Sequence, residues 1–132
     1  MESEVRLGEK HRIDLVVRSN GVREQVTLIE LEHHRHEIFT RQGEFRAEIT
    51  HAIHQVQDWI RWLRENPEHP TAQSLGNLPP SGLVIAGRSR FFTDDQRDRL
   101  AHLNAGSPVP VVTYDELLDR LRDLTLNRIE EN

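Results

Sequence analysis

The stretch from Arg12 to Glu32, RIDLVVRSNGVREQVTLIELE, decides the fold of this chain. In its first part, apolar residues alternate with other residues at a period of two, which is typical of a half-buried strand. These apolar residues are Ile13, Leu15 and Val17. Ser19-Asn20-Gly21 is a turn signal, and the residues from about Gln25 to Glu32 are rich in β-branched side chains. Two strand-like runs joined by a turn predict an antiparallel hairpin.

Alternation along the second run predicts which side chains share a face of the sheet. The residues expected on the core face are Thr27, Ile29 and Leu31. Glu30 and Glu32 then share the opposite face, ~7 Å apart at the usual rise per residue. If the apolar faces of the two strands match, Leu15 lies opposite Ile29, and the acidic faces match as well.

This register sets Asp14 directly beside Glu30 on the neighbouring strand. Two adjacent carboxylates repel each other unless a positive charge lies between them. A hard cation, Mg²⁺ or Mn²⁺, bound by both carboxylates and the main-chain carbonyl of Leu31 would supply that charge. The alternative is a solvated strand face whose acids pair with Arg12 and Arg18.

The rest of the chain alternates between strand and helix signals, and predicts a single domain over residues 1–132. Capping boxes, Thr93 with Gln96 and Thr113 with Glu116, predict two helix starts. Residues 66–80 contain four of the six prolines and are expected to form a loop, while Pro110 suits an edge strand. The expected strands are 5–7, 12–17, 25–32, 82–87 and 109–112, and the expected helices are 46–64, 93–106 and one from 113. This order predicts an α/β fold with a mixed sheet.

Composition limits the possible functions. The chain has no cysteine, so it has no disulfide, thiolate metal site or cysteine nucleophile, and a cytoplasmic setting is expected. No apolar run approaches 18 residues, so we expect no membrane span. The net charge of -5 argues mildly against non-specific nucleic-acid binding, although cations bound by clustered acids would offset part of it. Sixteen of the seventeen Lys and Arg residues are arginines, and Lys10 is the only lysine.

Four motifs in order resemble a known family. They are Ile29-Glu-Leu-Glu32, His51-Ala-Ile-His-Gln55-Val-Gln-Asp-Trp59, Ala86-Gly-Arg88 and Val112-Thr-Tyr-Asp115. An Asp in one strand, an acidic motif in the next and a helix with Gln resemble the PD-(D/E)xK phosphodiesterase superfamily. The four motifs together resemble, more closely, the nuclease domain of Shedu anti-phage defence proteins, from about Leu7 to Leu124.

The resemblance implies a restriction-endonuclease-like fold that hydrolyses DNA phosphodiester bonds with Mg²⁺ or Mn²⁺ in bacterial defence. It implies that Asp14 and Glu30 bind the metal, and that Gln55 is the family's helix glutamine. Gln55 with Trp59 is similar to the QxxxY element of related exonucleases, and Glu48 lies on the same helix flank. Without the resemblance, Gln55 would be read as a surface residue. The family also implies a homo-oligomer or a place in a larger defence protein.

Position 32 departs from the family, because Glu32 stands where the catalytic lysine is expected. A carboxylate can accept a proton or bind a second metal ion, whereas it cannot stabilise negative charge in the transition state. Lys10 is the only lysine that could replace it, and Arg12 cannot act as a base because it stays charged. We expect a Glu32-modified site rather than a rescue by Lys10.

Some further residues are accessory candidates. Glu9 is a candidate for the acid that the superfamily often carries on a first helix, for which this chain has little room. His33 follows the acidic strand, and Arg88 follows a buried strand and is a candidate phosphate contact, with ordinary surface roles as the alternative. Two other functions stay open: a catalytically silent fold that senses nucleic acid or assembles a defence complex, and a purely structural oligomerisation domain.

Overall fold

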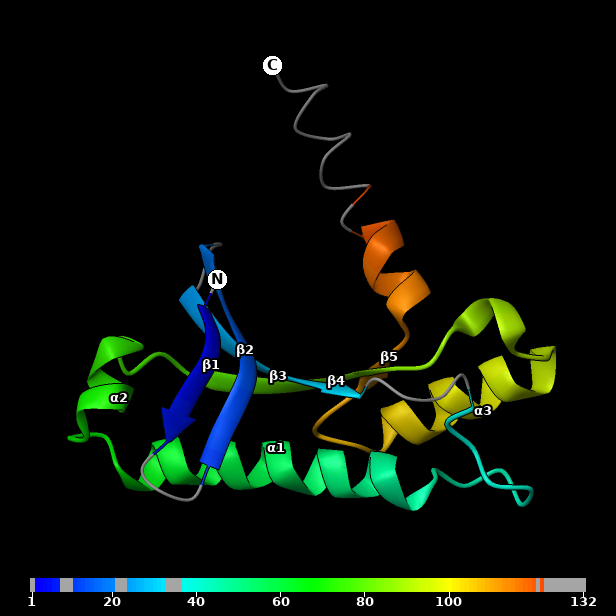
Figure 1. Ribbon diagram of the computed structural model, residues 1–132, viewed down its shortest axis with the longest axis horizontal. Helices are drawn as coiled ribbons and strands as arrows, with labels where there is room; N and C mark the ends of the chain where they lie inside the picture. The colour runs from blue at the N-terminus through cyan, green and yellow to red at the C-terminus, as the bar shows by residue number, and fades with distance from the viewer. Residues whose placement is uncertain (1, 8–10, 21–23, 33–36, 121, 123–132) are drawn as a thin grey trace.

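The computed structural model describes residues 2–7, 11–20, 24–32, 37–120 and 122, and its centre is a five-stranded mixed sheet in the order β1-β2-β3-β4-β5 (Figure 1). The first three strands are antiparallel neighbours, while β4 runs parallel to β3 and β5 runs parallel to β4. The strands are β1 (Glu2–Leu7), β2 (His11–Asn20), β3 (Glu24–Glu32), β4 (Pro80–Ala86) and β5 (Val111–Val112). The prediction of an α/β fold with a mixed sheet is confirmed.

The β2–β3 hairpin has the predicted register. Leu15 pairs with Ile29, and the pairing continues to Asn20 and Glu24. The predicted edge position of the last strand is also confirmed, because β5 ends the sheet and follows directly after Pro110.

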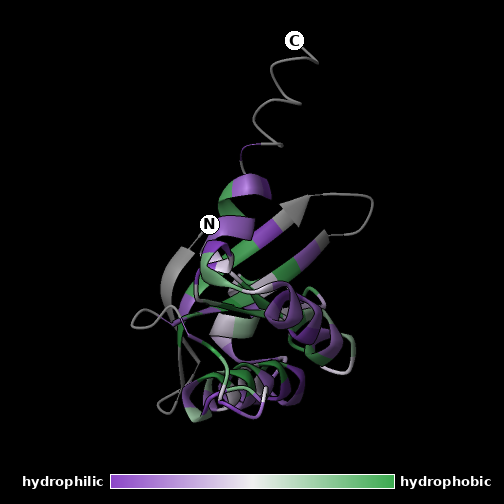
Figure 2. Ribbon diagram, turned by 90° about the vertical axis from the view of Figure 1, so that its right-hand side faces the viewer, coloured by the Kyte–Doolittle hydropathy of each residue, from purple (hydrophilic) through white to green (hydrophobic). Residues whose placement is uncertain are grey.

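The long helix α1 (Ala47–Glu65) covers one face of the sheet (Figures 1 and 2). Its apolar side is buried, whereas its outer side is hydrophilic, as its amphipathic sequence predicts. The helix packs tightly on β4 at Gly82, where an added Cβ would lie 2.2 Å from Cγ1 of Val56. The missing side chain at Gly82 therefore lets the helix pack directly on the strand.

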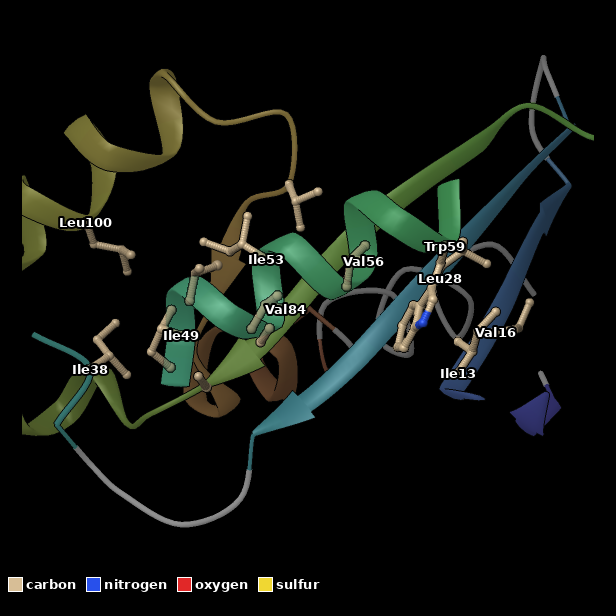
Figure 3. Close-up of a cluster of buried hydrophobic side chains, with 14 of the residues drawn as sticks. Ile13, Val16, Leu28, Ile38, Ile49, Ile53, Val56, Trp59, Val84 and Leu100 are labelled. Carbon is tan, nitrogen blue, oxygen red and sulfur yellow. The ribbon is translucent and has the colours of Figure 1, made fainter. Parts of the chain in front are cut away.

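The main core lies between α1 and the sheet (Figure 3). Trp59 is fully buried beside Leu28, with Val16 and Ile13 next to them. Further along the helix, Val84 packs beside Ile53. Gly82 lies against Val56, whereas Val84, further along β4, packs beside Ile53, which comes earlier in α1 (Figure 3). The helix and β4 therefore run in opposite directions.

The expected core face of the hairpin was partly wrong. The residues of β2 and β3 that fill the core under α1 are Ile13, Val16, Val26 and Leu28, whereas Thr27 and Leu31 are only half-buried. The reason is that β3 is a central strand covered on both faces: Leu28 is 0% exposed and its neighbour Ile29 is 5% exposed. Leu28 pairs with Gly82, and Gly82 faces α1, so Leu28 also faces α1. Because side chains of a strand alternate between its two faces, Glu30 and Glu32 lie on the same, α1-facing side as Leu28.

The proline-rich segment 66–80 is not entirely a loop, because it contains the short helix α2 (Pro70–Ser74). His69 caps this helix by accepting the N–H of Thr71 on its ring nitrogen, and Pro70 occupies the first helical position, where its fixed backbone angle is favourable. Ala72 and Leu75 are buried and anchor the segment to the body of the protein. One helical turn is too short to give a periodic signal in the sequence.

After β4 the chain forms the helical turn η1 (Ser89–Phe91) and the helix α3 (Asp94–Ala105). The predicted capping box of Thr93 and Gln96 is present in full. The last predicted helix covers residues 114–120 and lies on the opposite side of the sheet from α1 (Figures 1 and 2). Thr113 caps it by accepting the N–H of Glu116 at 3.3 Å. Within the described ranges, no helix has the length and apolar character needed to cross a membrane.

Candidate metal and catalytic site

Asp14 and Glu30 meet at the end of the β2–β3 ladder. The regular pairing of the two strands ends at Leu15 and Ile29, and beyond it Oδ2 of Asp14 accepts the main-chain N–H of Leu31 at 3.1 Å. The Asp14 carboxylate thus takes the place of a main-chain partner and is held against β3. It also lies within hydrogen-bonding reach of the Glu30 carboxyl group.

The main chain of Leu31 presents its polar groups to the same place. Its N–H points towards β2, because it bonds to Asp14. In a β-strand the N–H and C=O of one residue point towards the same neighbouring strand, so the Leu31 carbonyl is also directed to the β2 side. This is the arrangement expected for a carbonyl ligand beside the two carboxylates.

The environment of Glu30 disfavours its charged form. Burial, the hydrogen bond with Asp14 and the negative charges of Asp14 and Glu32 raise the pKa of Glu30 to about 8. Among the described residues, its Oε2 atom is also buried without a hydrogen-bond partner. A buried acceptor without a partner is costly, and a carboxylate pair this close cannot ionise fully unless a cation joins it.

These features fit a hard divalent cation. The donor set is two carboxylates and one main-chain carbonyl, which are the oxygen ligands that Mg²⁺ and Mn²⁺ prefer. The Glu30 oxygen without a partner is the atom that such an ion would satisfy. However, the described part of the chain contains no group of three or more His, Cys, Asp and Glu side chains with metal-binding geometry. Any ion here would depend on main-chain, water or substrate oxygens for its other ligands.

The predicted glutamine of α1 lies level with this pair. Glu30 is two residues beyond Leu28, about 6.6 Å further along the strand, which is about one helical turn. Because α1 runs antiparallel to the strand and Trp59 lies beside Leu28, the turn carrying Gln55 lies alongside Glu30. Gln55 is half-buried, so it is not a fully exposed surface residue.

The other two helix candidates have different surroundings. Trp59 is fully buried in the core, and its Nε1 atom, among the residues described, is buried without a hydrogen-bond partner. Glu48 is exposed in the first turn of α1. Along this flank of α1, Glu48 is exposed, Gln55 is half-buried and Trp59 is fully buried.

Tyr114 is a residue of the site that the sequence reasoning did not select. Its hydroxyl donates to the main-chain carbonyl of Glu32 at 3.3 Å. Burial is the main cause that raises the pKa of the Tyr114 hydroxyl, and the negative charges of Glu32 and Asp14 raise it further. Two signals were available: Tyr114 lies in the fourth motif, and it is the only tyrosine in the chain.

The third and fourth motifs form one structural unit. Nε of Arg88 donates to Oδ1 of Asp115 at 2.9 Å, and the main-chain N–H of Arg90 donates to Oδ2 of Asp115 at 3.0 Å. The Arg90 N–H is the main cause that lowers the pKa of Asp115, and Arg88 adds to it. Arg88, a candidate phosphate contact, therefore holds the turn after β4 in place.

Several accessory candidates lie outside the part of the chain that the structure describes. Glu9, Lys10 and His33 lie outside the described residues. The backbone of Arg12 pairs with Arg6 of β1, but its side chain lies outside the described part. Arg18 donates to the main-chain carbonyl of Ser74. Ion pairs between described residues join Arg46 to Glu37, Arg61 to Asp58 and Arg88 to Asp115.

The fold and the acid pair define an α/β protein with a carboxylate site at the end of the central strand of its sheet. Residues 2–118 match the family described as Shedu protein SduA, C-terminal. The chain therefore belongs to this family, which confirms the resemblance of its sequence to Shedu proteins. Family membership suggests a role in anti-phage defence. A search of curated proteins gives no match.

Proposed function

We propose that this chain is a restriction-endonuclease-like, Mg²⁺- or Mn²⁺-dependent nuclease domain that hydrolyses DNA phosphodiester bonds in anti-phage defence. The observation that carries the proposal is the contact of Asp14 with Glu30, in which one Glu30 oxygen is buried without a partner among the described residues.

Asp14, Glu30 and the Leu31 carbonyl would hold the metal ion. When bound, the ion would supply Lewis acidity and a positive charge for the phosphate oxygens. Asp14 is fixed by the Leu31 N–H, so its position does not depend on the ion. Gln55, level with Glu30 on α1, would orient the attacking water or the ligand shell through its amide.

Glu32 would act as the general base. It lies two residues after Glu30 in β3, and its charge reaches Glu30. In the proposed step the attacking water loses its proton to Glu32 as its oxygen bonds to phosphorus. The phosphorus–oxygen bond to the leaving group then breaks, and the leaving oxygen takes a proton from solvent. The positive charge that a lysine would contribute is missing, so we expect slow cleavage.

Two observations favour the silent-fold alternative. The described residues contain no complete three-residue metal cluster, and a glutamate replaces the expected lysine. A domain of this kind would bind nucleic acid or assemble a complex without cleaving.

Two measurements test the proposal. In calorimetry with Mn²⁺, we expect binding to the wild type and at least about tenfold weaker binding to Asp14→Asn and Glu30→Gln, because each loses one charged ligand. Glu68→Gln, which removes an exposed carboxylate between α1 and α2, is the matched control. Unchanged affinity in both site variants would remove the metal site.

The second measurement is cleavage of linear and circular DNA with Mg²⁺ or Mn²⁺. We expect Glu32→Ala to lower the rate and Glu32→Lys to raise it, because lysine restores the missing positive charge. Equal cleavage by Glu32→Ala and wild type would show that Glu32 is not catalytic. No cleavage by wild type with either metal, together with Mn²⁺ binding, would favour the silent fold.

A further inference from the structure

Tyr114 joins the ends of neighbouring strands at the acid site. Its hydroxyl donates to the Glu32 carbonyl, the last residue of β3, at 3.3 Å. Its main-chain N–H donates to the carbonyl of Gly87, directly after β4, at 3.1 Å. Tyr114 itself comes two residues after β5. One residue therefore ties β3 to β4 at the edge where the carboxylates lie.

The surroundings of Tyr114 are built to hold it there. Gly87 has a φ of +74°, a left-handed conformation that favours glycine. This conformation turns the main chain directly after β4. The next residue, Asp115, is anchored by Arg88 and by the N–H of Arg90. Thr113, the residue before, is fully buried and caps the helix at 114–120. The tyrosine is thus fixed on both sides, and its half-buried ring reaches the end of β3.

We propose that Tyr114 is a positioning residue of the acid site, which fixes the end of β3 and hence Glu32 by donating its hydroxyl to the Glu32 carbonyl. The role follows from where the hydrogen bond falls. Glu32 is the last residue of β3, and its main chain is held on one side by pairing with Ala86 of β4. The phenol supplies a second restraint.

A direct test uses the single tyrosine as a spectroscopic probe. Replacement of tyrosine by 3-fluorotyrosine in the full chain gives one ¹⁹F resonance and keeps the hydroxyl. We expect this resonance to move in Asp14→Asn and in Glu32→Gln, whose charges reach the phenol, and to stay in place in the Glu68→Gln control. A resonance that neither site variant moves would overturn the assignment, whatever the nuclease assay shows.

The activity test rests on the proposed nuclease function. We expect Tyr114→Phe to lower kcat about tenfold with an unchanged KM, the effect of losing one aligned hydrogen bond. The fluorotyrosine protein should keep the wild-type rate, and the urea midpoint of Tyr114→Phe should stay close to that of the wild type. A wild-type kcat in Tyr114→Phe would refute the role. If the wild type cleaves no DNA, the nuclease proposal fails, and the ¹⁹F shifts still decide whether Tyr114 is placed at the acids.

Discussion

Replacement of Glu30 by glutamine should remove part of the pH dependence of stability. Surroundings that disfavour its charge raise the pKa of Glu30 from 4.5 to about 8. Between these two values the folded protein keeps a proton that the unfolded chain releases. The contribution of Glu30 is therefore fully present below pH 4.5 and is lost as the pH rises through about 8.

The folded and unfolded states differ by one bound proton on Glu30, and this difference sets how steeply stability changes with pH. The free energy of unfolding should fall by about 1.4 kcal/mol for each pH unit within this window. Solvent screening of a half-buried group lowers its folded pKa, so it shortens the window and leaves the slope unchanged. Glu30→Gln removes the charge but keeps an amide that can donate to Asp14.

The assay is urea unfolding in EDTA across this pH range. Buried Trp59 and partly buried Trp62 give the fluorescence signal. We expect Glu30→Gln to match the wild type near the acid end and to become the more stable protein as the pH rises. Glu68→Gln should follow the wild type throughout. Parallel curves for Glu30→Gln and wild type at every pH would refute the coupling of the two carboxylates.

Two further predictions concern packing and the turn after β4. Gly82→Ala should lower the free energy of unfolding by about 1–3 kcal/mol in urea, because its new Cβ would lie 2.2 Å from Val56 and force α1 away from the sheet. Gly106→Ala, which has open space around the added Cβ, should cost nothing; equal losses in both variants would contradict the packing argument. Asp115→Asn should destabilise the protein at neutral pH and have little effect at strongly acid pH, because the lowered pKa of Asp115 means that its contribution is present above its unfolded pKa and lost as the pH falls through the folded value. Acid titration of both proteins by circular dichroism checks this, and a difference that persists at the lowest pH would count against it.

The parts of the fold that depend on local patterns were predictable. The pairing of Leu15 with Ile29 follows from matching two short alternating runs, and the start of α3 follows from the capping box at Thr93. The faces of β3 were not predictable by the same pattern. Alternation marks the core face only when the other face is solvated, and Ile29 is buried like Leu28.

The candidate site was predictable only in its local half. Asp14 and Glu30 directly adjoin the paired residues Leu15 and Ile29 of one hairpin, so the local pattern was enough to predict that they lie close together. Tyr114 reaches Glu32 across 82 positions of sequence, and no periodicity links residues so far apart. Only the complete sheet order, in which β4 and β5 run parallel to β3, places that tyrosine at the acids.

The two acids differ in what each does for the folded chain. Asp14 has a structural role, because its Oδ2 satisfies the Leu31 N–H that would otherwise lack a partner. Glu30 does not stabilise the fold in this way, since its Oε2, among the described residues, is buried without a partner and its charge is disfavoured. An asparagine at position 14 still offers an oxygen to that N–H, and a glutamine at position 30 removes an unfavourable charge. Both amides should therefore fold, and any loss of metal binding or cleavage in them reports on the site itself.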